Sequence, residues 1–286
     1  MKKSLGVCLG ASTVTFVKIA RSGDDINLEI CERIDHNGDP KHAFLDNFAK
    51  YYEPDDSLII TGRKFRKSVN ITNISEPEAT ESAIGYLNRR DKTKRFSAVA
   101  SLGGETFMVY TLDDDGRINS VITKNQCASG TGEFFLQQIK RMNLTIDETV
   151  AISHEAEPYK VSGRCSVFCK SDCTHALNKG VPKAEVAAGL SKMMSEKIEE
   201  LIHKAPAGKI LLIGGITLND VVMKFVRRKF PDAVIPEEAA YFEALGAAVY
   251  GLDHPAAAIE DINDIFAHQQ SSFGFLEPLE IHKDKV

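Results

Sequence analysis

One feature constrains the fold of this chain more than any other: the pattern of its first 35 residues returns after residue 95. Residues 4–35 predict three strands joined by short turns, in the segments SLGVCLG, VTFVKIAR and DINLEICERI. Residues 96–123, FSAVASLGGETFMVYTLDDDGRINSVIT, predict strand, Gly-Gly turn, strand, hairpin turn and strand. Two copies of one module in a single chain indicate internal duplication and two related halves.

Each module leads into helices and one further buried strand. After the first module come a predicted helix over residues 39–52, the strand SLIITG, and a helix that begins at Ser75, with its capping partner Glu78, and runs to about Arg90. Strands that alternate with helices predict an α/β protein. After the second module come helical patterns at 130–143, 146–155, 167–179 and 183–205, the strand KILLIGGITLN, the helix DVVMKFVRRKF and a helix of small residues over 236–252.

The composition excludes several classes of protein. A net charge of −5 and a pI near 5.9 argue against a nucleic-acid partner, which requires a strongly basic face. No apolar run reaches the roughly 18–20 residues of a membrane span, and the apolar stretch after MKK is too short for a signal peptide, so we expect a cytoplasmic protein. In a reducing cytosol, clustered cysteines favour metal binding or redox chemistry over disulfides.

Three turns of small residues each follow a predicted buried strand: LGAST at 9–13, LGGET at 102–106 and IGGIT at 213–217. Small residues let backbone N–H groups approach a phosphate closely, and the Ser and Thr hydroxyls add donors. A tight turn of any α/β protein is the alternative for each one alone. Two of the turns, however, occupy the same place in the duplicated module, and the third opens a strand-to-helix unit. This order predicts that the turns clamp a nucleotide between two halves of the chain.

The segments GVCLGASTVTFVKIA, SLGGETFMVY, NQCASGTGEFF, LLIGGITLND and YFEALGAAVYG, in this order, resemble the actin-like ATPase fold (ASKHA), in which a ribonuclease H-like motif is duplicated. More narrowly, over about residues 4–252, the chain resembles the BadF/BadG/BcrA/BcrD ATPase family, the activators of 2-hydroxyacyl-CoA dehydratases. The segments CASGTGEFF and RCSVFCKSD carry this narrower resemblance. It implies two lobes with a nucleotide cleft between them. The first lobe is 1–95 plus a C-terminal helix at about 236–252, the second is 96–235 with the cluster cysteines, and 253–286 is an extension or tail.

The resemblance also implies an activity. It implies an ATP-dependent activator that passes a low-potential electron to an iron–sulfur acyl-CoA dehydratase or a related reductase. It further implies an anaerobic homodimer that shares one [4Fe–4S] cluster, with ATP or ADP and Mg²⁺ as cofactors and a ferredoxin or flavodoxin as electron donor. Neither a nucleic acid nor a membrane is expected as a partner.

The nucleotide would lie on the glycine turns. We expect its phosphates on the backbone of 10–13, 103–106 and 130–132, and its adenosine beside the third turn and the helix that follows. The residues that the resemblance assigns to nucleotide binding are Gly10, Ala11, Ser12, Thr13, Gly103, Gly104, Gly130, Thr131, Gly132, Gly214 and Gly215.

Two cysteines stand directly before predicted helices: Cys127 before the one that begins near Thr131, and Cys165 before the one that begins near Val167. The positive end of a helix dipole and its free N–H groups favour a thiolate. The resemblance assigns this pair to the cluster, and structural cysteines are the alternative. Because a [4Fe–4S] cluster takes four thiolates, two per chain imply two chains.

Cys169 and Cys173 follow Cys165 at helical spacing and share a face of the same predicted helix. On one interpretation they are small buried residues at a helix contact. On the other they are alternative ligands or a second metal site near the dimer axis.

The chain departs from the family where carboxylates are expected. Cys8 in the first strand and Ser101 before the second glycine turn stand where relatives of this fold carry the Asp or Glu residues that hold Mg²⁺ and its waters. Glu105 replaces a Gln after Gly-Gly, near where the γ-phosphate would sit. It is therefore the candidate catalytic residue, as a Mg²⁺ ligand or as the group that orients water. The alternative is that Glu105 simply starts the next strand.

Two other functions fit the same fold. A degenerate module that does not hydrolyse nucleotide would act in dimerisation or nucleotide sensing, and the exchange of both carboxylates favours it. A sugar kinase of this fold would transfer phosphate to a sugar, but the phosphate motifs show no obvious Asp to serve as base.

Overall fold

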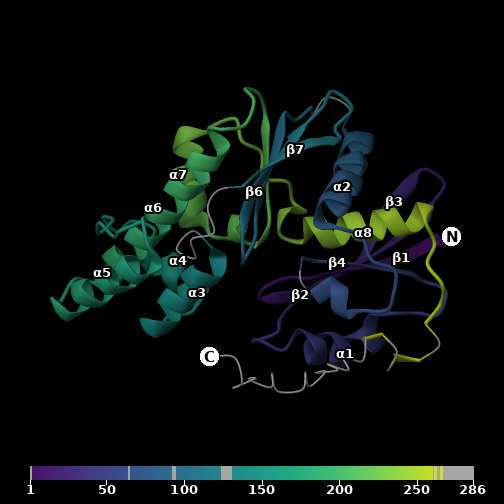
Figure 1. Ribbon diagram of the computed structural model, residues 1–286, viewed down its shortest axis with the longest axis horizontal. Helices are drawn as coiled ribbons and strands as arrows, with labels where there is room; N and C mark the ends of the chain where they lie inside the picture. The colour runs from purple at the N-terminus through teal and green to yellow at the C-terminus, as the bar shows by residue number, and fades with distance from the viewer. Residues whose placement is uncertain are drawn as a thin grey trace, which may run out of the picture.

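Two four-stranded sheets with the same strand order form the framework of the molecule (Figure 1). The computed structural model describes residues 2–63, 65–91, 95–123, 131–259, 261–262 and 265–266. The first sheet has the order β3-β2-β1-β4, with β1 at Lys2–Leu9, β2 at Thr13–Ser22, β3 at Asp25–Asp35 and β4 at Ser57–Thr61. The second has the order β7-β6-β5-β8, with β5 at Ala98–Leu102, β6 at Phe107–Leu112, β7 at Ile118–Thr123 and β8 at Ile210–Ile213.

The two sheets repeat one pairing pattern. In each, the first strand of the module pairs antiparallel with the second and parallel with the later strand, β4 or β8. The registers match as well, because Cys8 pairs with Thr61 and Ser101 pairs with Ile213, each at the end of its parallel ladder. This repeat confirms the internal duplication that the sequence predicts.

Helices lie outside and between the two sheets (Figure 1). α1 (Pro40–Tyr51) packs Phe44 and Phe48 on the first sheet, and α2 (Glu76–Arg90) and α8 (Phe242–Asp253) lie between the sheets. The remaining helices lie on the far side of the second sheet: α3 (Gly132–Arg141), α4 (Ile146–Ser153), α5 (Ser166–Asn178), α6 (Lys183–Ile202) and α7 (Asp220–Lys229). Short 3₁₀ turns in the described part of the chain are η1 (Phe65–Ser68), η3 (Gly215–Leu218) and η4 (Ala239–Tyr241).

The two helices between the sheets begin differently. α2 begins with the predicted capping box, in which Ser75 and Glu78 satisfy each other's backbone N–H groups. The helix predicted from residue 236 begins only at Phe242. The preceding residues form η4 instead, where the carbonyl of Ala239 accepts a hydrogen bond from the N–H of Gly214 at 2.7 Å. A contact between distant segments therefore shortens the helix that local periodicity predicts.

Glycines allow α8 to pack unusually close to its neighbours. A Cβ at Gly6 of β1 would lie 2.1 Å from the carbonyl oxygen of Ala244, and a Cβ at Gly246 would lie 1.7 Å from that of Ala79 in α2. No side chain fits at either distance, so glycine is required at both positions. α8 is thereby held between β1 and α2, and its first turn reaches the open edge between the sheets.

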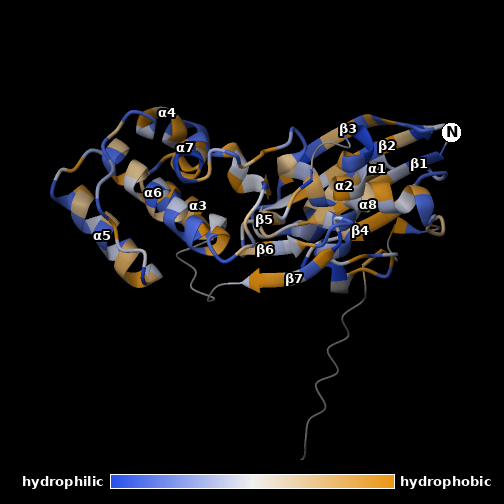
Figure 2. Ribbon diagram, turned by 90° about the horizontal axis from the view of Figure 1, so that it is seen from above, coloured by the Kyte–Doolittle hydropathy of each residue, from blue (hydrophilic) through white to orange (hydrophobic). Residues whose placement is uncertain are grey.

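α5 lies at the end of the molecule farthest from the N-terminus in both views (Figures 1 and 2). It packs on α6, and its cysteines Cys169 and Cys173 are buried in the core of the second lobe. This confirms their interpretation as small buried residues at a helix contact. Among the described residues, no helix is both long and apolar enough to cross a membrane.

Candidate functional site

A cleft of about 1220 Å³ opens between the two halves of the molecule. Its walls come from the turns after β1 and β5, the start of α3, the turns η3 and η4, and the first residues of α8. The turns after β1 and β5 and the turn η3 follow buried strands, so the sheets fix their positions. The cleft therefore lies where the two copies of the duplicated module face each other.

The backbone at the edge of the cleft repeats in both halves. Gly62 follows β4 with φ +122°, and a Cβ there would lie 2.3 Å from the carbonyl oxygen of Leu9. Gly214 follows β8 with φ +97°, and its Cβ would lie 2.5 Å from that of Leu102. Both the positive φ and the close approach require glycine. The two halves thus support their glycine turns with the same backbone conformation.

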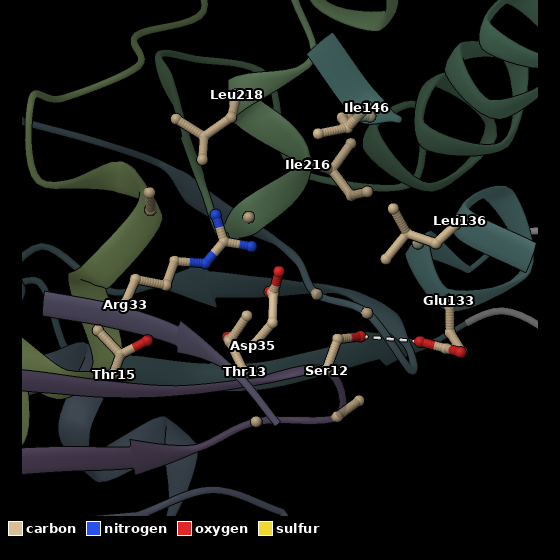
Figure 3. A pocket seen from close by; sticks show the side chains of 18 of the residues that line it. Ser12, Thr13, Thr15, Arg33, Asp35, Glu133, Leu136, Ile146, Ile216 and Leu218 are labelled. Carbon is tan, nitrogen blue, oxygen red and sulfur yellow. Dashed lines mark hydrogen bonds between the residues drawn. The ribbon is translucent and has the colours of Figure 1, made fainter. Parts of the chain in front are cut away.

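The first two glycine turns are in contact across the cleft. A Cβ at Gly104 would meet the Ser12 hydroxyl oxygen at 3.0 Å and the Cβ of Ala11 at 3.3 Å. The Ser12 hydroxyl donates a hydrogen bond of 2.8 Å to the carboxylate of Glu133, in the first turn of α3 (Figure 3). This bond joins the first lobe to the second, and it places a negative charge beside both turns.

Apolar side chains form one wall of the cleft, and polar ones face it from the first lobe (Figure 3). Leu136, Ile146, Ile216 and Leu218 form the apolar wall, and Leu218 is 56% exposed. Exposed leucine and isoleucine side chains that gather in a cleft are typical of a ligand site. Opposite them, the Arg33 guanidinium reaches toward η3, close enough that a Cβ at Gly215 would lie 2.8 Å from its nitrogen.

The structure brings together most of the residues that the sequence assigns to nucleotide binding. Those that line the cleft are Gly10, Ala11, Ser12, Thr13, Gly103, Gly104, Gly132, Gly214 and Gly215. Thr131 caps α3 by accepting a hydrogen bond from the N–H of Phe134 at 3.2 Å, and Gly130 lies outside the described residues. Glu105 is not among the described residues that line the cleft, and its catalytic role stays a prediction.

Sequence reasoning missed Glu243, the carboxylate at the floor of the cleft. It stands in the first turn of α8 and accepts a hydrogen bond from the Ser101 hydroxyl at 3.1 Å and one from the Cys8 thiol at 3.6 Å. These donors are the two residues that replace the expected carboxylates. In the sequence, the signal for this carboxylate is the single acidic residue of the segment FEALGAA, whose small residues otherwise indicate close helix packing.

Burial sets the protonation behaviour of this group. It raises the pKa of Glu243 to about 7, helped by the negative charge of Glu76 and opposed by the hydrogen bonds from Ser101 and Cys8. Glu76 pairs with Arg63 at 3.0 Å. Burial and the same two carboxylates raise the pKa of the Cys8 thiol well above its usual value, so it stays a hydrogen-bond donor at neutral pH.

Cys165 occupies a different part of the molecule. It is the N-cap residue of α5, partly exposed, and its side chain makes no capping hydrogen bond. Val167 and Phe168 follow it with 69% and 64% exposure. Cys127, its predicted partner, lies outside the described residues. Within the described part of the chain, no three His, Cys, Asp or Glu side chains are gathered so that they could hold a metal ion.

Comparisons with known proteins agree on one group. Residues 60–251 match the family model described as the BadF/BadG/BcrA/BcrD ATPase family. The 2-hydroxyisocaproyl-CoA dehydratase activator of Clostridioides difficile is 23% identical over 67% of this chain and 71% of its own length. The activator of lactoyl-CoA dehydratase of Anaerotignum propionicum is 23% identical over 87% of this chain and 97% of its own.

A solved structure, the activator of the 2-hydroxyisocaproyl-CoA dehydratase from Clostridium difficile with bound ADPNP, superposes with a TM-score of 0.76. The match covers 88% of this chain and 95% of that one, at 21% sequence identity. The likeness shows a shared fold, and the expected actin-like ATPase fold is confirmed.

Proposed function

This chain belongs to the BadF/BadG/BcrA/BcrD ATPase family, and we propose that it is an ATP-dependent activator of an iron–sulfur acyl-CoA dehydratase or a related reductase. The observation that carries the proposal is the cleft, in which the glycine turns of both modules meet over a floor shared by the two sheets. The similarity to two dehydratase activators, one of them along nearly its whole length, supports the same role.

The proposed nucleotide spans the cleft from the glycine turns to the apolar wall. Its phosphates would accept hydrogen bonds from backbone N–H groups of the turns at 10–13 and 103–106 and at the start of α3. The base would pack on Leu136, Ile216 and Leu218, which supply the apolar surface that a purine ring needs. Arg33, which points into the cleft, would meet the phosphates or the ribose.

Mg²⁺ fits this site only in a limited way. The ion is commonly bound by one or two carboxylates together with substrate phosphates and water. The cleft floor supplies one carboxylate, Glu243, and one hydroxyl, Ser101. The donor set is therefore sufficient if the nucleotide completes it.

We also propose that Cys165, together with Cys127, holds one [4Fe–4S] cluster between two copies of the chain. Such a cluster supplies low-potential one-electron chemistry when bound. Cys165 suits the role because it is partly exposed, stands at the N-terminus of α5, and is followed by the exposed side chains of Val167 and Phe168. A second chain would cover these side chains.

The proposed coupling runs from the cleft through the helices on the far side of the second sheet. ATP between the glycine turns would change the angle between the lobes, because the turns belong to different sheets. α6 and α5 pack on the second lobe and would carry that change to Cys165. The cluster's exposure would then follow the nucleotide state. A ferredoxin or flavodoxin is the proposed electron donor, and a dehydratase is the acceptor.

A second candidate function is a nucleotide-sensing module without hydrolysis. Two observations favour it: the first two glycine turns are in contact, and the Glu133 carboxylate lies beside them. The Ser12 hydroxyl is engaged with Glu133, and phosphates on these turns would lie beside that negative charge.

Calorimetric titration of ATP into the purified dimer, followed by an ATPase assay, separates the two functions. The activator should bind ATP with Mg²⁺ and hydrolyse it, whereas the sensing module should bind without turnover. The Glu133→Gln variant should bind ATP about 3–10-fold more tightly, because a neutral amide removes one charge repulsion at the phosphate turns. Asp147→Asn, elsewhere on the cleft wall, is the matched control. Absence of ATP binding in both wild-type and Glu133→Gln protein would contradict the proposed function.

A further inference from the structure

We propose that Glu243 is the carboxylate with which this chain holds the magnesium ion of its nucleotide. The inference rests on the proposed function, and it deepens that function by assigning the metal contact to α8 rather than to β1 or β5. The positions before the glycine turns in those strands are Cys8 and Ser101, which offer a thiol and a hydroxyl.

The location of Glu243 follows from the duplication. Cys8 and Ser101 are equivalent residues of the two modules: each stands one residue before its strand ends, and each pairs with the residue before a positive-φ glycine, Gly62 or Gly214. One carboxylate accepts hydrogen bonds from both of them. Glu243 therefore lies between two equivalent positions of the duplicated module, within hydrogen-bond distance of both. A magnesium ion bound with a nucleotide in the cleft would find this carboxylate at the cleft floor, beside the ends of both strands.

The packing of α8 against β1 places the Glu243 side chain between Cys8 and Ser101. Gly6 lies two residues before Cys8 on the same face of β1, and it contacts the backbone of Ala244 and Ala248. Because α8 touches β1 so closely, the side chain of its neighbouring residue Glu243 starts beside the tip of Cys8. Its place is thus fixed by backbone contact, as a metal ligand requires.

The other carboxylates of the cleft are less suited. The Glu133 carboxylate is hydrogen-bonded to Ser12 of the first turn rather than to Cys8 and Ser101 at the strand ends, and Asp35 stands at the exposed end of β3. Among the described residues, Glu243 is the carboxylate that accepts hydrogen bonds from the ends of both strands, from Cys8 of β1 and from Ser101 of β5. The neighbouring Tyr110 hydroxyl is fully buried and has no hydrogen-bond partner among the described residues. A buried polar group with unsatisfied hydrogen-bonding capacity therefore lies near Glu243.

The chemistry of the donors agrees with this assignment. Mg²⁺ is a hard cation that prefers carboxylate oxygen, so the Cys8 thiol is a poor ligand. Cys8 and Ser101 instead orient the carboxylate by donating hydrogen bonds to it. With one protein carboxylate, the remaining ligands are phosphate oxygens and water. The ion should therefore bind together with the nucleotide rather than before it.

Calorimetric titration of ATP, with Mg²⁺ and with EDTA in place of Mg²⁺, tests the inference without any assay of turnover. We expect Mg²⁺ to tighten ATP binding to the wild-type protein by about tenfold or more, the scale of one metal-site contact. Glu243→Gln should lose this enhancement and keep its affinity in EDTA. Glu196→Gln, at an exposed position of α6 outside the residues that line the cleft, is the control and should retain the enhancement. The double variant Cys8→Asp/Glu243→Gln should regain the Mg²⁺ enhancement. In this variant the carboxylate stands at position 8, whose thiol donates a hydrogen bond to Glu243 in the wild-type protein.

Each outcome decides the question. If Glu243→Gln binds ATP with the wild-type Mg²⁺ enhancement, the inference is wrong and the proposed function stands. If the wild-type protein binds ATP equally well with Mg²⁺ and with EDTA, the inference is also wrong and the proposed function stands. If the wild-type protein binds no ATP under either condition, the proposed function fails, and this assignment with it. Thermal melting verifies folding first. Should the single variant not fold, the double variant decides, since its lack of enhancement would overturn the inference.

Discussion

At the scale of single residues, the chemistry of the cleft depends on where one carboxylate is placed. The two strands that lead into the glycine turns end in a thiol and a hydroxyl, and neither can carry charge at neutral pH. Glu243 supplies the charge from a helix, at the price of burial beside Glu76. The same residue therefore serves the proposed nucleotide site and opposes the stability of the protein without nucleotide.

This opposition predicts how stability depends on pH in metal-free protein. The pKa of Glu243 rises from 4.5 to about 7 on folding. Below pH 4.5 the Glu243 carboxyl group is neutral in both the folded and the unfolded chain. Between pH 4.5 and about 7 only the unfolded chain loses this proton, so the contribution of Glu243 to the free energy of unfolding falls as the pH rises through this range. Arg63, Glu76, Cys8 and Tyr110 are the ionisable groups around it.

Glu243→Gln should therefore match the wild-type melting temperature near pH 4.5 and exceed it above pH 7. Above pH 7 the expected gain in the free energy of unfolding is on the order of 1–3 kcal/mol, since one pKa unit corresponds to about 1.4 kcal/mol. Melting curves in EDTA across this range measure it. A gain that is equal at both ends of the range would show that Glu243 does not titrate in this way.

At the scale of elements, α8 connects the fold to the site. Its small residues let it lie against β1 and α2, and this contact sets the position of its first turn. The segment FEALGAA indicates close packing, but which strand it meets depends on contacts between distant parts of the chain.

Gly246→Ala should destabilise the protein by about 1–3 kcal/mol, because the added Cβ would lie 1.7 Å from a backbone oxygen of α2 and α8 must move away. Gly85→Ala is the matched control: it stands in α2 with open space around it, and should stabilise by about 0.5–1 kcal/mol. Urea unfolding of both variants measures the difference. Equal stability of the two would contradict the packing described for α8.

The same contrast explains what the sequence could predict. The duplicated strands, the capping box of α2 and the glycine turns are local patterns, and each appears in the structure where the sequence predicts it. The late start of α8 and the place of Glu243 depend on Gly214, Gly6 and Ala79, which are distant in sequence. No window of neighbouring residues contains that information.

At the scale of the whole molecule, the two proposed sites stand apart. The cleft lies between the sheets, whereas Cys165 begins a helix on the far side of the second lobe (Figure 1). Phe168, one turn from Cys165, is 64% exposed, which is unusual for its size. The proposed second chain would cover it.

Phe168→Glu should therefore convert the proposed dimer to a monomer and leave the fold intact. Loss of a buried aromatic contact at the centre of an interface should raise the dissociation constant by about 30-fold or more. Leu28→Glu on β3, also exposed but in the first lobe, is the control and should leave the mass in solution unchanged. Light scattering after gel filtration measures both, and an unchanged dimer in Phe168→Glu would place the interface elsewhere.

The central claim is that two chains share one iron–sulfur cluster under the control of the nucleotide cleft. The most direct measurement is the content of iron and acid-labile sulfide per chain in protein purified without oxygen, together with its mass in solution. We predict about two irons and two sulfides per chain in a dimer, because one four-iron cluster is divided between two chains. A folded, iron-free monomer would contradict the claim.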